Sequence, residues 1–246
     1  MFKKLLATIG IGGAKVDTIL TTEIVSPGDT ISANIVVVGG DSEQEISGLD
    51  LALMTRVKVE RDDTEMMLNK SLAHWHIADK FVIQPGEVKE IPFTGTLPHE
   101  TPISANEARN NQTRVWIATG LNIDMAIDAS DKDPLHVVAT STQSKVLQAM
   151  DDCGYSLVKA DVEEGQLRGN GFVSTTGCYQ ELEFRPNKFA LFGLNEVEIS
   201  FVPTPDQTHI LLELDRNFGG DSYLSLSLGN NISQEEVTAR IKALLG

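Results

Sequence analysis

Two histidines on either side of a tryptophan come closest, by type and spacing, to a metal site in this chain. His74 and His76 lie two positions apart. In a strand, side chains at i and i+2 point to the same face, so the two imidazoles could share a metal ion. No third ligand lies nearby in the sequence, although His99, His136 and His209 occur elsewhere. A polar strand face is the simpler interpretation, and we predict neither a metal nor a cofactor.

The remaining candidate groups lack the spacing that a known chemistry requires. Asp128, Asp131 and Asp133 do not follow the Asp-x-Asp-x-Asp-Gly pattern of a calcium loop, so we interpret them as solvated turn carboxylates. The sequence contains no nucleophile elbow, no His-Glu-x-x-His and no Gly-x-x-x-x-Gly-Lys. We therefore predict no catalytic residues and a protein that is not an enzyme.

Composition narrows the class of partner. The 246 residues carry 20 Lys and Arg against 35 Asp and Glu, a net charge of −15, which would repel a phosphate backbone and argues against nucleic acid. No stretch reaches the roughly 18 apolar residues that a membrane span needs, so we expect no stable membrane insertion. Cys153 and Cys178 are too few for a disulfide scaffold and are expected to be reduced. These features predict a cytoplasmic protein.

Alternation of apolar and polar residues dominates the first half and predicts β-strands. From 49 to 60 the odd positions are apolar apart from one threonine, and 114–128 has a similar pattern. Shorter strands are expected at 14–20, 31–38, 75–83, 88–97 and 135–138, separated by turns rich in proline and glycine. Many strands without helices between them predict an antiparallel β-sandwich.

The second half begins with a helix signal and then returns to strands. Thr140 and Gln143 have the spacing of a capping box, for a helix that ends near Gly154. A second capping box, Ser233 with Glu236, starts a helix near the end of the chain. Between them, strands are expected at 155–161, 179–185, 197–201, 210–214 and 223–228.

The complete prediction is an all-β protein. We expect two tandem antiparallel β-sandwiches with short N-terminal, linker and C-terminal helices, the first of them formed by apolar residues at 2, 5, 6 and 9. Residues 1–138 would form the N-terminal sandwich, 139–154 the helical linker, and 155–246 the C-terminal sandwich with its terminal helix. The segment 98–112 lacks periodicity and is either a flexible surface connection or a loop that contacts a partner.

Several motifs along the chain support a resemblance to a known family. The most specific is the opening, Phe2-Lys3-Lys4-Leu5-Leu6 followed by Ile9-Gly10-Ile11-Gly12. Later motifs are Trp116-Ile117, Leu121-Asn122-Ile123, Asp131-Lys132-Asp133, Gln180-Glu181-Leu182-Glu183-Phe184-Arg185-Pro186 and Leu212-Glu213-Leu214-Asp215-Arg216. Together they resemble the bacterial sporulation-control proteins of the stage-zero sporulation protein M family over nearly the whole chain.

The resemblance implies an arrestin-like architecture and a regulatory or adaptor role. We therefore expect a non-enzymatic, cytoplasmic, sporulation-control-like protein that acts by binding other proteins, with a homodimer as an open alternative. An arrestin-type mechanism would move the two domains about a hinge. We place that hinge at Asp131, Lys132, Asp133 and Pro134, because proline restricts the residue before it.

Two other functions remain open from the sequence. One is a metal- or small-molecule-dependent enzyme whose site between the domains would use His74, His76 or His136. It requires a histidine pocket with converging polar groups. The other is a sandwich that binds a carbohydrate or another small molecule, which requires an exposed aromatic platform. Aromatic residues make up only 6% of the chain.

Overall fold

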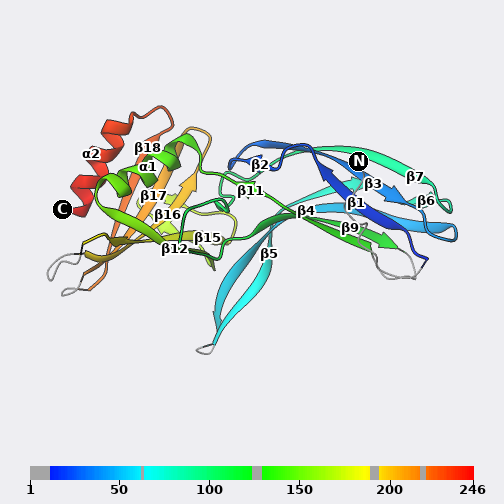
Figure 1. Ribbon diagram of the computed structural model, residues 1–246, viewed down its shortest axis with the longest axis horizontal. Helices are drawn as coiled ribbons and strands as arrows, with labels where there is room; N and C mark the ends of the chain where they lie inside the picture. Colours follow the sequence, from blue (N-terminus) through cyan, green and yellow to red (C-terminus); the bar gives the residue numbers. More distant parts are fainter. Residues whose placement is uncertain (1–11, 62–63, 124–128, 189–193, 217–219) are drawn as a thin grey trace.

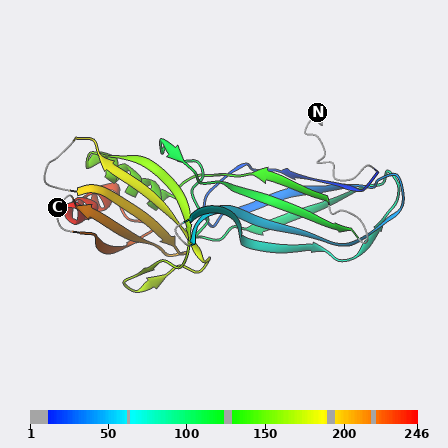
Figure 2. The same cartoon turned by 90° about the horizontal axis from the view of Figure 1, so that it is seen from below.

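The computed structural model of this protein describes residues 12–61, 64–123, 129–188, 194–216 and 220–246. Figure 1 shows an elongated molecule with two bodies along its long axis, one made of strands and the other carrying both helices. The turned view in Figure 2 shows that long strands run from one body toward the other. The predicted N-terminal helix and Asp128 lie outside the described residues.

The first body is a two-layer antiparallel sandwich. One layer has the strand order β1-β3-β7, and the other has β10-β9-β4 with β5 and β6 on the far edge of β4. The short strands β2 and β11 pair in parallel beside them. The bounds are β1 (Lys15–Leu20), β2 (Ile24–Val25), β3 (Thr30–Val38), β4 (Gln44–Arg61), β5 (Thr64–Ala78), β6 (Phe81–Ile83), β7 (Val88–Thr96), β9 (Val115–Ile123), β10 (Ala129–Pro134) and β11 (His136–Val137).

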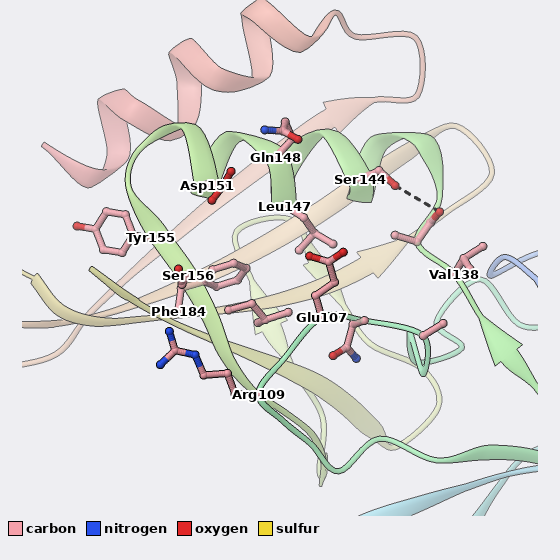
Figure 3. A pocket seen from close by; sticks show the side chains of 14 residues that line it. Glu107, Arg109, Val138, Ser144, Leu147, Gln148, Asp151, Tyr155, Ser156 and Phe184 are labelled. Carbon is pink, nitrogen blue, oxygen red and sulfur yellow. Dashed lines mark hydrogen bonds between the residues drawn. The ribbon is translucent and has the colours of Figure 1, made fainter. Parts of the chain in front are cut away.

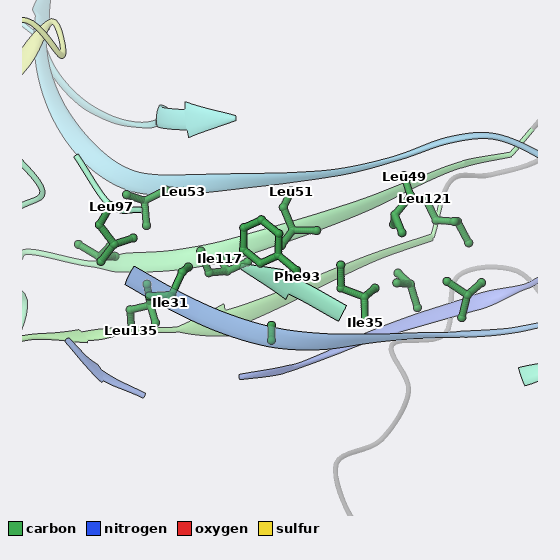
Figure 4. Packing of buried hydrophobic residues seen from close by; sticks show 14 of the residues in the cluster. Ile31, Ile35, Leu49, Leu51, Leu53, Phe93, Leu97, Ile117, Leu121 and Leu135 are labelled. Atoms are coloured by element: carbon green, nitrogen blue, oxygen red, sulfur yellow. The ribbon is translucent and has the colours of Figure 1, made fainter. Parts of the chain in front are cut away.

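The apolar rows predicted from alternation meet between these layers. Ile31 and Ile35 of β3 face Leu51 of β4 and Ile117 of β9, and all four side chains are fully buried (Figure 4). Full burial of such a side chain contributes about 1.5–3 kcal/mol relative to exposure. The strand predicted at 49–60 is confirmed, because its burial alternates residue by residue.

One strand was missed, and its sequence explains why. The expected strand at 75–83 is two strands, and β5 starts much earlier, at Thr64. The added part contains Met66, Met67 and Leu68 in a row, so it lacks the alternation by which half-buried strands are recognised. It forms the outer half of a long hairpin with β4.

The second body is the five-strand part of a sheet that continues from β4 of the first body through the parallel pairing of Lys58 with Glu163, and it is backed by two helices. Its strand order is β12-β15-β16-β17-β18, with a small hairpin, β13-β14, beside it. The bounds are α1 (Ser141–Asp152), β12 (Tyr155–Glu164), β13 (Arg168–Gly169), β14 (Phe172–Val173), β15 (Cys178–Pro186), β16 (Leu194–Pro203), β17 (Gln207–Arg216), β18 (Ser222–Gly229) and α2 (Gln234–Leu245). The strand β8 (Asn110–Asn111) pairs with β12.

The all-β class is confirmed, but the partner of this second sheet differs from the expected second layer of strands. The apolar face of the sheet, with Leu182 and Leu212, packs against Met150 of α1 and Ile241 of α2. The other face carries glutamates at alternate positions, so most of it cannot be buried against an apolar layer. Thr140 caps α1 through the full predicted capping box, and the Ser233 hydroxyl accepts the Glu236 N–H at the start of α2.

The β4-β5 hairpin connects the two bodies. Val57 and Val59 of β4 pack with Val162 of β12 and with Cys178 of β15 in a separate apolar cluster.

Both cysteines, Cys153 and Cys178, have free thiols, and burial raises the pKa of each thiol, which keeps it protonated at neutral pH. Within the described residues, no helix has both the length and the apolar character needed to cross a bilayer.

Candidate functional site

The aperiodic segment 98–112 connects the two bodies through polar contacts, which are exposed or part-buried at Glu100 and buried at Ile103. The Glu100 carboxylate accepts the backbone N–H groups of Thr175 and Thr176 and both of their hydroxyls, at donor–acceptor distances from 2.7 to 3.3 Å. A charged acceptor with several donors makes stronger hydrogen bonds than a neutral one. Because Glu100 is hydrogen-bonded to the second body, the segment 98–112 is not a free surface loop. Contact with another protein cannot be its whole role either.

A second contact buries a side-chain amide. The Gln180 Oε1 accepts the Ile103 N–H, and its Nε2 donates to the Ile103 carbonyl, both at 2.8 Å, and to Thr113 Oγ1 at 2.9 Å. Ile103 itself belongs to the core of the second body, although it precedes that body in the sequence. Ser104 continues the contact: its hydroxyl donates to Leu135 O and accepts from Val137 N–H.

A groove of about 570 Å³ lies beside this contact. Figure 3 shows α1 along one side and the 105–109 segment along the other. Leu147, Leu157 and Phe184 form an apolar patch in its lining, and much of the remaining lining is polar, including the exposed side chains of Glu107 and Arg109. A concave surface that combines an apolar patch with polar groups can hold a ligand or a peptide. The complete lining is Ala105, Asn106, Glu107, Arg109, Val138, Ala139, Ser144, Leu147, Gln148, Asp151, Tyr155, Ser156, Leu157 and Phe184.

The groove also contains an open strand edge. Strand β8 pairs with β12 only at Lys159 and Ala160. The preceding residues, Tyr155 to Leu157, pair with β15 on one side and line the groove, with no described strand on the other side. An extended chain can add to such an edge by main-chain hydrogen bonds. Within the described chain, this is a strand edge that opens into a groove of mixed apolar and polar lining.

The two candidate metal-binding histidines do share a face, as predicted, but carboxylates already engage them. His76 Nδ1 lies 2.9 Å from Asp50 Oδ1 and its Nε2 lies 3.0 Å from Asp79 Oδ1, while His74 Nε2 lies 3.8 Å from Asp50 Oδ1. Hydrogen bonding to Asp50, then to Asp79, raises the pKa of His76. The sequence search missed Asp50, which only the β4-β5 register places opposite His76.

Neither these histidines nor the others form an enzyme-like pocket in the described residues. The side chains of His74 and His76 are 62% and 53% exposed. His136 is exposed as well, and His209 is buried in a stack on Phe172, with ring centroids 4.8 Å apart. Burial lowers the pKa of His209. None of the four lines the groove.

The outer face of the second sheet is crowded with carboxylates. The register aligns Glu183, Glu198 and Glu213 directly across three strands, between Lys159 on β12 and Tyr223 on β18. Oxygen atoms of Asp161, Glu163 and Glu181, and likewise of Glu183, Glu196 and Glu198, lie within 4.8 Å of one another. Cationic side chains already neutralise part of this charge: Lys159 pairs with Asp161 at 2.7 Å, and Arg185 pairs with Glu183 and Glu196 at 2.8 Å each.

Burial and neighbouring charge perturb two of these glutamates strongly. Desolvation, followed by repulsion from Glu198 and Glu163, raises the pKa of Glu181 to about 8. Desolvation, followed by repulsion from Glu213, raises the pKa of Glu198 to about 7. The face therefore takes up protons near neutral pH, which lowers the repulsion between its strands.

The four residues predicted as a hinge lie in strand β10. Asp131 is opposite Thr119, Lys132 opposite Ala118, Asp133 opposite Ile117 and Pro134 opposite Trp116 of β9. Asp131 Oδ2 also accepts the Thr18 N–H at 2.8 Å. Pro134 occupies the end of an edge strand, where its missing N–H costs little. A hinge role for 131–134 stays a prediction. Movement of β10 relative to β9 would break this pairing, whereas movement of the two strands together would preserve it.

Known proteins resemble this chain in sequence and in structure. The Spo0M family model, described as SpoOM protein, matches residues 2–218. The sporulation-control protein spo0M of Bacillus subtilis (strain 168) is 36% identical over 220 residues, which cover 89% of this chain and 82% of that protein. The crystal structure of Spo0M, sporulation control protein, from Bacillus subtilis superposes with a TM-score of 0.82 at 30% identity, covering 96% of this chain and 98% of that one. The chain therefore belongs to the Spo0M family.

Proposed function

We propose that this protein is a cytoplasmic, non-enzymatic regulatory adaptor that binds an extended segment of a partner protein in the groove beside α1. The observation that carries the proposal is the open edge of β12 at Tyr155–Leu157, which lies within the groove. The partner strand would pair with this edge and direct an apolar side chain toward Leu147 and Phe184. The name of the Bacillus subtilis relative, a sporulation-control protein, supports a regulatory role.

Comparison with the two alternatives favours a binding protein. An enzyme would be expected to gather several perturbed groups in its pocket, whereas the groove lining contains neither histidine nor cysteine, and the pKa of its Tyr155 is raised chiefly by burial. A carbohydrate site would present an exposed aromatic platform. Both tryptophans are only partly exposed, and Trp75 packs edge-on against Phe93 with ring centroids 5.4 Å apart.

We further propose that 1–138, which contains the sandwich, and 155–246, which contains most of the helix-backed sheet, act as two functional units connected by the linker 139–154. The groove is lined by all three parts, so a bound partner would be sensitive to the angle between the units. In this mechanism the segment 129–138, including Asp131 and Pro134, absorbs the change of angle. Opening of the Glu100 and Gln180 contacts would have to accompany such a change.

A site-specific photo-cross-linking experiment tests the groove. A photoreactive phenylalanine analogue replaces Glu107 in one variant and exposed Val88, on the first body, in a matched control. We expect irradiation in cells to join a defined protein to the Glu107 variant alone. A synthetic peptide covering the cross-linked segment should then bind the purified chain, and Leu147→Glu should weaken that binding at least tenfold while Val88→Glu should not. Equal cross-linking at both positions, or binding unchanged by Leu147→Glu, would refute the groove as the partner site.

A further inference from the structure

The β4-β5 hairpin carries an exposed apolar triplet, which we define as Met66, Met67 and Leu68. Their exposed fractions are 39%, 38% and 39%. Every other exposed large apolar side chain of the described residues stands alone in the sequence. Single exposed apolar residues are ordinary on protein surfaces. Here Met66 and Leu68 share one face of the strand and Met67 lies on the other, so apolar surface is exposed on both faces of the same short stretch.

The triplet lies on a strand with an unused edge. Leu68 is opposite Val57 and Met66 opposite Val59 on β4, and no described strand pairs with the other edge of β5. Proteins usually protect such an edge with proline, charge, a bulge or short length. Strand β5 has 15 residues and no proline, and the irregularity in its pairing lies beyond the triplet, near Ser71.

The rest of the molecule leaves this edge open. The second body covers the β4 side of the hairpin, where Val57 and Val59 are buried against Val162. Figure 1 shows β4 and β5 extending together beyond the sandwich of the first body, on the side away from α1 and α2. The apolar surface that begins in the buried cluster therefore continues onto β5 without cover.

We propose that the chain forms a two-fold homodimer in which β5 of one copy pairs antiparallel with β5 of a second copy, centred on Met67. A two-fold axis between antiparallel strands of one sheet is perpendicular to that sheet, so opposed residues share a face. In the register centred on Met67, this residue faces itself, and Met66 faces Leu68 of the second copy. Directly opposed apolar pairs of this kind stabilise strand pairing by about 0.2–1 kcal/mol each.

Charge favours the same register. Glu65 faces Asn69 of the second copy and Lys70 faces Thr64, so no two like charges are opposed. In each copy Glu65 is also paired with Lys58 at 3.2 Å and Lys70 with Glu164 at 3.9 Å. The contact is a single strand pair, which is small for a stable complex, and each copy carries a net charge of −15. The dimer is therefore weak and concentration-dependent, and added salt strengthens it by screening the overall repulsion.

Analytical ultracentrifugation of the full chain tests the dimer. We expect the average mass to rise with protein concentration, more steeply in high salt than in low salt. Met67→Lys places two ammonium groups opposite each other and should raise the dissociation constant about tenfold or more. Val88→Lys changes the net charge equally at an exposed position of β7 and should leave the constant within about twofold.

A cross-link tests the register. Directly opposed residues of antiparallel strands have Cα atoms about 4.5–5.5 Å apart, which suits a disulfide. Met67→Cys should therefore give a disulfide-linked dimer when an added oxidant takes up the electrons of the two thiols, and Val88→Cys should not. A chain that stays monomeric at every concentration, or a dimer unaffected by Met67→Lys and not cross-linked by Met67→Cys, overturns the proposal. These outcomes leave the groove proposal untouched, because no residue of the groove lies in β5.

Discussion

The side chain of Gln180 binds the backbone of Ile103 on both its polar groups, as a neighbouring strand would. The amide oxygen accepts the Ile103 N–H and the amide nitrogen donates to the Ile103 carbonyl, each at 2.8 Å. Gln180 is 7% exposed and Ile103 is 1% exposed. Because buried backbone groups need partners, this one side chain allows an aperiodic segment to cross the junction without unpaired polar groups.

Removal of this amide should weaken the fold. Gln180→Met keeps the approximate volume but leaves the Ile103 N–H and carbonyl unpaired in the interior. We expect the free energy of unfolding to fall by about 2–4 kcal/mol in urea titrations. Gln148→Met, on the exposed surface of α1, is the matched control and should change it by less than about 0.5 kcal/mol. Equal effects of the two variants would contradict the role given to Gln180.

Glu100 should hold the segment before β15 in place. Glu100→Gln introduces N–H donors where Thr175 and Thr176 already donate, so part of this network must break. We expect about tenfold faster hydrogen exchange at these two amides and a loss of about 1–3 kcal/mol in stability. Glu90→Gln, which alters an exposed hydrogen bond to Asn34 in the first body, is the control. Unchanged exchange at Thr175 would show that Glu100 does not order this segment.

Stability should decrease as the pH rises toward 8. The pKa values of Glu181, about 8, and Glu198, about 7, lie above the usual value of a glutamate, so the folded chain holds protons that the unfolded chain has released. This stabilisation is fully present below the pKa of a glutamate in the unfolded chain, near 4.5, and it is lost as the pH rises through the folded-state pKa values of about 7 and about 8. Glu181→Gln should raise stability at pH 8 by on the order of 1 kcal/mol and flatten the pH dependence between about pH 5 and pH 8. Thermal melts across that range, with Glu90→Gln as control, measure both effects.

His76 should titrate above an ordinary histidine. Its two ring nitrogens face Asp50 and Asp79, which stabilise the imidazolium and raise its pKa. The resulting stabilisation is present at low pH and disappears as the pH rises through the raised pKa. In a two-dimensional NMR titration, Asp50→Asn should move the His76 midpoint down, and Asp79→Asn should move it less. A midpoint unaffected by Asp50→Asn would mean that the pair does not persist in solution.

The sequence predicted the parts of the fold that depend on local pattern. Strand β4 alternates strictly between buried and more exposed residues, and Thr140 with Gln143 marks the start of α1, so both could be located from one-dimensional periodicity. The outer part of β5 could not, because Met66, Met67 and Leu68 protrude with both faces exposed and therefore follow no core-facing period.

The candidate site depends on contacts between distant residues, which explains why the sequence did not reveal it. Gln180 and Ile103 are 77 positions apart, and Asp50 reaches His76 only through strand register. The sequence did mark 98–112 as unusual by its length and lack of period. It could not show that Glu100 and Ile103 bind the second body, because that depends on the tertiary packing. The placement of 131–134 in a paired strand was missed for the same reason.

The cluster formed by Val57 and Val59 with Val162 and Cys178 affects how this protein can be divided. A polypeptide ending at residue 138 would retain the two valines but lose the aliphatic and sulfur atoms that cover them. The complementary fragment would expose Cys178 to solvent and oxidants. Calorimetry of the intact chain should accordingly record one cooperative endotherm, and separately expressed fragments should prove prone to aggregation.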